Sequence, residues 1–151
     1  MVKIEIRPTQ AGDAEALAAA LRESDRAELA AVGFDDMLAP IAGSVGVSTL
    51  CWTALVDDQV ACVLGVSPLE GDTGSPWMLG TPLLDQHARV LVRKTPEYID
   101  RMLGAFPHLL NYVHAGNATS VRWLRRLGFT LAEPQPYGAR GELFHQFEMR
   151  A

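Results

Sequence analysis

The sequence predicts a mixed α/β (α+β) protein in which helices cover both faces of one sheet. Residues 2–6 alternate aliphatic and charged side chains, the period of a half-buried strand. Residues 50–56 and 60–66 are β-rich runs around an acidic turn, which is typical of an antiparallel hairpin. Asn117 and Gly128 supply a start and a stop signal for one helix. The predicted order is strand, helices, three strands, helices, strand, helix and two strands.

Length and charge limit the class of protein. The 151 residues suit one domain over 1–151 that buries about two thirds of its unfolded surface. With 13 Lys and Arg against 18 Asp and Glu, the net charge of −5 argues against a general nucleic-acid binder. The charge is uneven, because residues 1–72 carry 4 basic and 12 acidic side chains whereas residues 73–151 carry 9 and 6. A basic patch in the second half stays possible.

The first half of the chain also predicts a long amphipathic helix. It starts at a cap, Thr9 or Asp13, and runs to about Val32, just before Gly33. Its apolar stripe has i, i+3, i+4, i+7 spacing and consists of Ala14, Leu17, Ala18 and Leu21. After the hairpin, a loop is expected before a short strand at 77–79.

In the second half, two Thr-Pro pairs place a capping hydroxyl ahead of a proline at the first helical position. Thr81-Pro82 and Thr95-Pro96 therefore predict consecutive helices over 82–94 and 96–106. Further strands are predicted over 109–114, 129–132 and 142–149, the last two separated by a Pro/Gly-rich loop.

The two cysteines, Cys51 and Cys62, lie on the two strands of the predicted hairpin. With a three-residue loop at 57–59 they point to opposite faces of the sheet. With a two-residue loop they share a face but stand roughly 13 Å apart along the strand. Neither arrangement gives the ~4.4–6.8 Å Cα separation of a disulfide, so we predict two free thiols, as in a reducing compartment.

Two stretches bear on location. Residues 1–6 lack the apolar segment of a signal peptide. Residues 37–56 carry no charge and are long enough to span a membrane, but proline, glycine and hydroxyl residues interrupt them. We therefore expect no membrane span and a cytoplasmic location.

Three stretches together resemble the GCN5-related N-acetyltransferase (GNAT) superfamily. They are the opening strand and helix over 6–17, the 50–66 hairpin with its acidic turn, and the Asn…Gly-Phe helix over 117–129. The resemblance covers nearly the whole chain. It implies a mostly antiparallel central sheet with helices on both faces, and acetyl-CoA as the cofactor if the protein is active.

The resemblance also implies where a cofactor would lie. Leu79, Gly80 and Thr81 correspond to the end of the fourth strand, and Asn117 to a residue that can orient the pantetheine arm. In the family a Gly-rich loop follows that strand, and its amides cradle the pyrophosphate. Residues 79–85 depart from this pattern.

The departures affect both binding and catalysis. Only Gly80 could take a positive φ without strain, Pro82 has no N–H, and Asp85 puts negative charge where phosphates would lie. The family's tyrosine general acid stands seven residues after the Asn, which is Leu124 here. The strand over 77–79, where a Glu base often stands, has no carboxylate. The catalytic residues are therefore unknown.

Several candidate residues also have a purely structural interpretation. Asn117 fits a helix N-cap better than a ligand contact, and the Gly80-Thr81 turn fits an ordinary strand-to-helix connection. His145 fits a hydrogen-bonded core histidine better than a base. The arginines over 122–126 fit a solvated helix face better than a phosphate patch. His108 and His114 have no partner at a ligand spacing, so no metal site is predicted.

Two functional hypotheses follow. Residues 76–81 and 117–129 also resemble a narrower group, GNAT-like internal virion proteins of tailed phages. This favours a phage-encoded protein without robust catalysis that contacts virion or host proteins, in the host cytoplasm or the virion. The alternative is a divergent acetyl-CoA-dependent N-acyltransferase that binds acyl-CoA near Leu79, Gly80 and Asn117 and transfers the acyl group directly to an amine.

Overall fold

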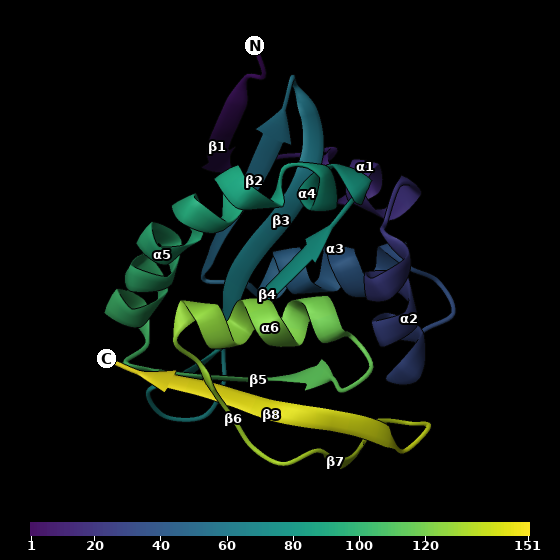
Figure 1. The fold of residues 1–151 in the computed structure, drawn as a ribbon, viewed down its shortest axis with the longest axis vertical. Coiled ribbons are helices and arrows are strands. Elements are labelled where there is room, and N and C mark those ends of the chain that lie inside the picture. Colours follow the sequence, from purple (N-terminus) through teal and green to yellow (C-terminus); the bar gives the residue numbers. More distant parts are fainter.

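A computed structural model describes residues 1–151 (Figure 1). In chain order the elements are β1 (Ile4–Pro8), α1 (Asp13–Ala19), α2 (Glu23–Ala31), α3 (Leu38–Val47), β2 (Leu50–Val56), β3 (Gln59–Pro68), β4 (Thr73–Gly80), α4 (Pro82–Gln86), α5 (Ala88–Ala105), β5 (His108–His114), α6 (Ala118–Leu127), β6 (Thr130–Leu131), β7 (Gln135–Tyr137) and β8 (Glu142–Arg150). No helix is both long and apolar enough to cross a membrane.

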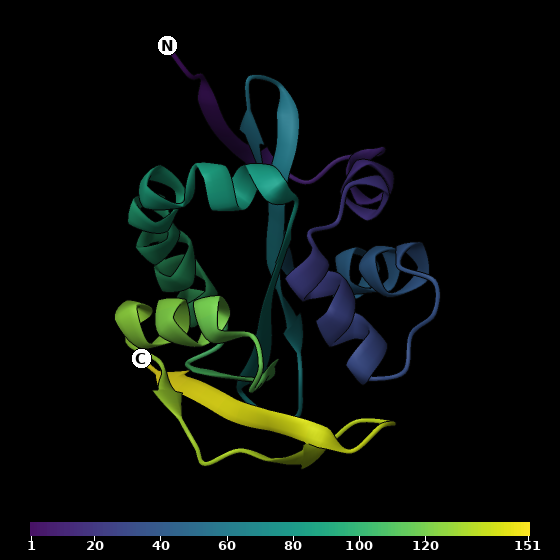
Figure 2. The same cartoon turned by 45° about the vertical axis from the view of Figure 1, so that its right-hand side comes forward.

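All eight strands form one sheet in the order β1-β2-β3-β4-β5-β8-β6, with β7 paired to β8. Every pairing is antiparallel except that of β4 with β5, which is parallel. Helices α1 to α3 lie on one face of the sheet and α4 to α6 on the other (Figure 2). The predicted fold class is therefore confirmed.

The sheet separates two hydrophobic cores, because successive side chains of a strand point to opposite faces. On β3, Cys62 and Leu64 join the larger core beneath α4 to α6, while Val63 joins the smaller core beneath α1 to α3. Leu109 and Leu17 are fully buried in the larger and smaller core, respectively. The two cores clamp the central strands from both sides.

Strands β4 and β5 form a fork. They pair only where they begin, at Thr73 with His108 and at Gly74 with Leu109, and then diverge (Figure 1). A cross-strand chain of hydrogen bonds holds the closed end: the Thr73 hydroxyl lies 3.1 Å from His108 Nδ1, and His108 Nε2 lies 2.7 Å from Glu148 on β8. The fork opens toward α2.

The long helix predicted over 13–32 is wrong, because the chain forms two helices, α1 and α2. Arg22 interrupts it with an extended backbone, φ −66° and ψ 153°. Its N–H donates to the carbonyl of Gly80 at 2.9 Å, a bond across the molecule that replaces a helical one. Helix α3, which was not predicted from the sequence, covers the first half of the uncharged segment 37–56 and buries Ile41.

The boundary predicted between helices at Thr95-Pro96 is also wrong. The break lies at His87, and α5 continues through Pro96. The Thr95 hydroxyl does not cap a new helix but donates to the carbonyl of Leu91 at 2.9 Å. The buried side chains on both sides of the proline keep the helix on the sheet, so packing outweighs the cost of one missing hydrogen bond. These buried side chains are Leu91, Tyr98, Ile99 and Met102.

The hairpin combines parts of both expected arrangements. Its turn has two residues, Asp57 and Asp58, both with positive φ as in a type I′ turn. A register shift between residues 54 and 55 inserts an extra residue, however, and this places the two cysteines on opposite faces. Both Cys51 and Cys62 are free thiols, and burial raises the pKa of Cys62 to about 12.

Candidate functional site

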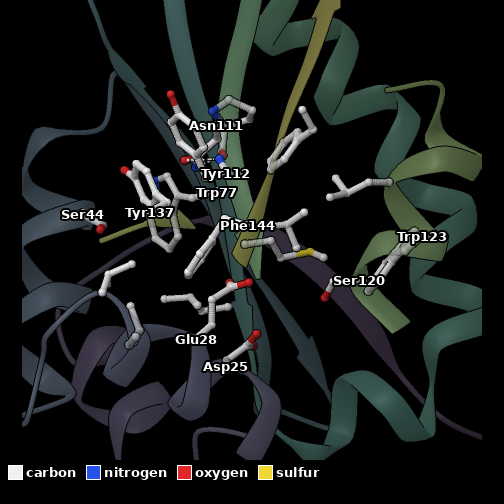
Figure 3. Close-up of a pocket in the computed structure, with 18 of the residues that line it drawn as sticks. Asp25, Glu28, Ser44, Trp77, Asn111, Tyr112, Ser120, Trp123, Tyr137 and Phe144 are labelled. Carbon is white, nitrogen blue, oxygen red and sulfur yellow. Dashed lines mark hydrogen bonds between the residues drawn. The ribbon is translucent and has the colours of Figure 1, made fainter. Parts of the chain in front are cut away.

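The fork encloses a cavity of about 400 Å³, which lies within the size range of small-molecule sites. The lining comes from both faces of the sheet, with α2 and α3 on one side and α6 on the other (Figure 3). Residues 76–79 of β4 and 111–113 of β5 form the walls between them. The cavity is thus a passage through the sheet, and we refer to it as the passage.

The strand register decides which backbone groups face the passage. Thr81 N–H donates to the carbonyl of Ala61 on β3, so odd-numbered residues of β4 bond to β3 and even-numbered ones face β5. Of these, the Pro76 carbonyl accepts from Asn111 Nδ2 at 2.7 Å. The backbone of Met78 therefore faces the passage without a strand partner on that side.

Two carboxylates of α2 close the open end of the fork. Asp25 accepts the N–H of Gly80 at the end of β4 at 2.8 Å, and Glu28 accepts the N–H of His114 at the end of β5 at 2.7 Å. Because they are three residues apart, both lie on the same face of the helix. Neither residue was predicted from the sequence as part of a site. A signal was present, since they lie at i+4 and i+7 from Leu21, the last residue of the predicted apolar stripe.

Glu28 is the group in the passage whose protonation is most perturbed. Burial is the main cause, and it raises the pKa of the carboxyl to about 7, although the His114 N–H lowers it. Asp25, unlike Glu28, has a cation as a partner, because Arg22 binds it bidentately at 2.7 and 3.2 Å. A carboxyl that titrates near neutral pH can accept or release a proton under physiological conditions.

The Glu28→Gln variant should be more stable than the parent protein at pH 8 and close to it at pH 5. The folded state keeps the Glu28 proton to higher pH than the unfolded chain, so stability falls as the pH rises from about 4.5 to above 7. Gln lacks this titration but can still accept the His114 N–H. We expect a gain of about 1–3 kcal/mol at pH 8, measured by urea unfolding at both pH values. An equal effect at both would contradict the assigned pKa.

Aromatic side chains form one wall of the passage. Tyr112 and Tyr137 stack with centroids 4.1 Å apart, Tyr137 contacts Phe144 edge-on at 5.3 Å, and Phe144 contacts His114 edge-on at 5.0 Å. Figure 3 shows Tyr112, Tyr137 and Phe144 grouped on one side, with the carboxylate of Glu28 pointing into the cavity beneath them. Tyr137 is 41% exposed, so the wall reaches the surface.

The β4–α4 turn is closely packed within the chain. Gly80 ends β4 without a positive φ. A Cβ on Gly80 would collide with Leu84 and lie 3.2 Å from the Ala61 carbonyl. The glycine therefore allows close packing within the chain.

The N–H groups of this turn are bonded within the chain. Pro82 has none, and Thr81 caps α4 with both its hydroxyl and its carbonyl. The bonds run from Gly80 to Asp25 (2.8 Å), from Thr81 to Ala61 (2.9 Å), from Leu83 to the Thr81 hydroxyl (3.3 Å) and from Leu84 to the Thr81 carbonyl (2.9 Å). A phosphate would have to displace these bonds.

The charged side chains at the turn are also paired with one another. Arg22, whose side chain is 4% exposed, binds the carboxylate of Asp85 at 2.9 Å besides that of Asp25. The Asp85 side chain is 54% exposed and stands beside the first turn of α4. One guanidinium thus serves two carboxylates, and the group of three carries a net negative charge when both are ionised.

Asn117 is the N-cap of α6. Its Oδ1 accepts the N–H of Ser120 at 3.2 Å as an N-cap, and Asn117 is not among the residues that line the passage. Its Nδ2 is buried without a partner, as is Nε1 of Trp123. Leu124, at the position of the family's tyrosine, lines the passage beside Trp123 and Ser120.

The other predicted positions are dispersed. Leu79 is 7% exposed and lines the passage, whereas Gly80 and Thr81 lie in the turn beyond it. His145 lies outside the lining, 2.8 Å from the Ala132 carbonyl through Nδ1. The three arginines of α6, at positions 122, 125 and 126, are exposed and form no ion pair. No three His, Cys, Asp or Glu side chains are grouped so as to hold a metal ion.

Comparisons with known structures identify the fold. No protein-family model matches the sequence, and no curated protein matches it significantly. The structure, however, matches the ribosomal-protein-S18-alanine N-acetyltransferase of Escherichia coli with a TM-score of 0.69 over 98% of this chain and 94% of that one. The sequences are 15% identical. This chain has the GNAT fold.

Two further structures support this assignment. A GNAT-family acetyltransferase of Bacillus anthracis has a TM-score of 0.72 at 10% identity, covering 98% of this chain and 95% of that one. The PaiA N-acetyltransferase of Thermoplasma acidophilum, solved in complex with coenzyme A, has a TM-score of 0.64 at 14% identity and 99% coverage of both chains. The predicted GNAT fold is thus confirmed, and identities this low concern the fold alone.

Proposed function

We propose that this chain is a GNAT-fold protein with an eroded acetyl-CoA site, which acts by binding other proteins and not by robust acetyl transfer. The observation that carries the proposal is the β4–α4 turn, over residues 80–84. Its N–H groups are bonded within the chain and Pro82 has none, so no set of free donors awaits a pyrophosphate. Anion sites of this kind depend on such donors.

Electrostatics at the turn support the same conclusion. Asp85 lies beside the first turn of α4, and Arg22, the nearest cation, is shared between Asp85 and Asp25. An incoming phosphate would meet a like charge, at a cost on the order of one to several kcal/mol depending on exposure.

The passage also lacks the family's acid at its expected position. Leu124 contributes only methyl groups there, and the β4 residues in the lining, 76–79, carry no ionisable side chain. The groups that usually protonate the leaving thiolate and deprotonate the amine are therefore replaced.

A thermal-shift titration with acetyl-CoA tests the proposal. Ligand at ~100 times its Kd adds ~2.7 kcal/mol to the stability of a folded state that binds it. We expect no change in the melting temperature up to millimolar acetyl-CoA, with a GNAT enzyme of known cofactor affinity as the positive control. A concentration-dependent rise for this protein would contradict the eroded site.

One observation favours a second candidate, a divergent acetyl-CoA-dependent N-acyltransferase. Glu28 supplies from α2 a carboxylate that β4 lacks, and its pKa of about 7 suits a general base. In this role it would take a proton from a substrate ammonium group. Acyl transfer to amines, assayed with labelled acetyl-CoA and lost in Glu28→Gln, would establish this candidate in place of the first.

The proposed binding role extends to association with a phage virion or host protein. Its support is the resemblance of residues 76–81 and 117–129 to GNAT-like internal virion proteins. Mass spectrometry of purified particles of the encoding phage should detect the chain at a constant copy number. Its absence from the particles would exclude the virion role.

A further inference from the structure

We propose that the passage binds an alkylated organic ammonium ion, with the carboxylate of Glu28 as its counter-ion and the aromatic wall of Tyr112, Tyr137 and Phe144 around its alkyl groups. Neither acetyl-CoA nor catalysis is needed for this binding, so it can fail or succeed independently of the function proposed above.

The charge of the passage points to a cation. Of the two α2 carboxylates in the lining, Asp25 is already bound by Arg22, whereas Glu28 has no cation within ion-pair distance. Its contact in the protein is one N–H, that of His114 at 2.7 Å. Burial without a countercharge is what raises its pKa, and a bound cation would supply that charge.

The wall of the passage suits alkyl groups and positive charge together. Tyr112, Tyr137, Phe144 and His114 form a continuous series of ring contacts with centroids 4.1 to 5.3 Å apart. Aromatic rings attract cations through their quadrupole, and the effect grows when the cation is desolvated. Tyr137 is exposed and Phe144 is buried, so the rings extend from the surface into the passage, where Glu28 accepts the backbone N–H of His114.

The aromatic wall favours an alkylated ammonium over a primary one, because Tyr112, Tyr137 and Phe144 present ring surfaces to the ligand. A desolvated NH₃⁺ group needs partners for three N–H bonds. In the lining, the Asp25 oxygens already bind Arg22 and Gly80, and the Pro76 carbonyl binds Asn111, so Glu28 and the Met78 backbone would have to supply most of them. A trimethylammonium group has no N–H to satisfy, and its methyl groups can pack on the rings.

The volume and the access are adequate. A cavity of about 400 Å³ holds a small organic ion, and its lining includes two rings that are more than 40% exposed, Phe34 and Tyr137. Phe34 follows α2 and Tyr137 lies on β7, and the exposure of both rings shows that the cavity reaches solvent beside them.

Choline and its uncharged isostere 3,3-dimethylbutan-1-ol provide matched probes. We expect choline to bind at least tenfold more tightly at pH 8, measured by titration of the protein's ¹H–¹⁵N NMR spectrum. Ethanolammonium should bind more weakly than choline. Equal affinity for choline and the neutral isostere would overturn the proposal, and so would tighter binding of ethanolammonium.

Variants locate the site. Glu28→Gln should lower the affinity for choline at least tenfold without changing the affinity for the isostere. Glu23 is an exposed carboxylate on the same helix, and Glu23→Gln should change neither affinity. Tyr137→Leu keeps apolar bulk, removes one ring and should weaken choline severalfold. Unchanged choline affinity in Glu28→Gln, with a folded spectrum, would overturn the proposal. If the Glu28→Gln variant does not fold, an unchanged choline affinity in Tyr137→Leu would overturn the proposal instead.

The affinity should also depend on pH. If only ionised Glu28 binds choline, a pKa of about 7 implies a loss of about 30-fold between pH 8 and pH 5.5. Other titratable or charged groups facing Glu28 are Asp25, Arg22 and His114, and His114 in turn bonds Glu142 at 2.7 Å. The dependence that remains in Glu28→Gln measures the contribution of groups other than Glu28. No loss in the parent protein would contradict the assignment of Glu28.

Discussion

Replacing Arg22 by Met should lower the free energy of unfolding by about 3–5 kcal/mol, the largest effect we expect of any single substitution near the site. The guanidinium is buried and binds Asp25 through two bonds and Asp85 through one. Without it, Asp25 remains buried at the end of β4 with the N–H of Gly80 as a partner. Burial already raises the pKa of Asp25, so the loss of the guanidinium leaves an uncompensated charge or forces protonation.

Two controls separate the buried pair from the exposed one. Asp85→Asn should cost less than about 1 kcal/mol, because that carboxylate is 54% exposed. Adding Asp25→Asn to Arg22→Met should recover part of the loss, since the amide can still accept the Gly80 N–H without carrying charge. Urea unfolding of the four proteins measures all three effects. A loss below 1 kcal/mol for Arg22→Met would show that the pair does not hold α2 on the turn.

Gly80→Ala should destabilise the protein by about 1–3 kcal/mol through overpacking. The added Cβ would collide with the side chain of Leu84, which is fully buried and has no room to move aside. It would also lie 3.2 Å from the Ala61 carbonyl. Gly80 is thus required by packing within the chain, independently of any ligand.

Gly43→Ala is the matched control. Gly43 lies inside α3, and a Cβ there would have no neighbour within 4 Å. The same substitution should therefore stabilise by about 0.5–1 kcal/mol, because alanine favours the helix. Opposite signs for the two variants in thermal and urea unfolding are the expected result. A neutral Gly80→Ala would show that the turn is looser than the contacts indicate.

The sequence predicted the fold class because its strands and the α6 helix carry local signals. The alternation over 2–6, the hairpin pattern and the Asn117–Gly128 pair each determine only the element in which they lie. The helix boundaries failed where distant contacts decide them. Arg22 leaves the helix to bond the Gly80 carbonyl, and Pro96 stays helical because the residues around it are buried.

The candidate site divides in the same way. The sequence shows that the β4–α4 turn contains Pro82 and Asp85 and that Leu124 stands in place of the family's tyrosine. Glu28 was not identified, because its role depends on α2 crossing the open end of the fork. Nor could any local pattern place Asp25 on the N–H of Gly80, 55 positions further along the chain. Sites built between elements distant in sequence require the structure.

A ¹H–¹⁵N NMR titration with coenzyme A tests the central claim most directly, since it observes the N–H groups that a pyrophosphate would bind. The signals of Gly80, Thr81, Leu83 and Leu84 should not move up to millimolar coenzyme A, because each N–H is already bonded within the chain. Saturable shifts confined to these four signals would contradict the account and restore a cofactor site at the turn.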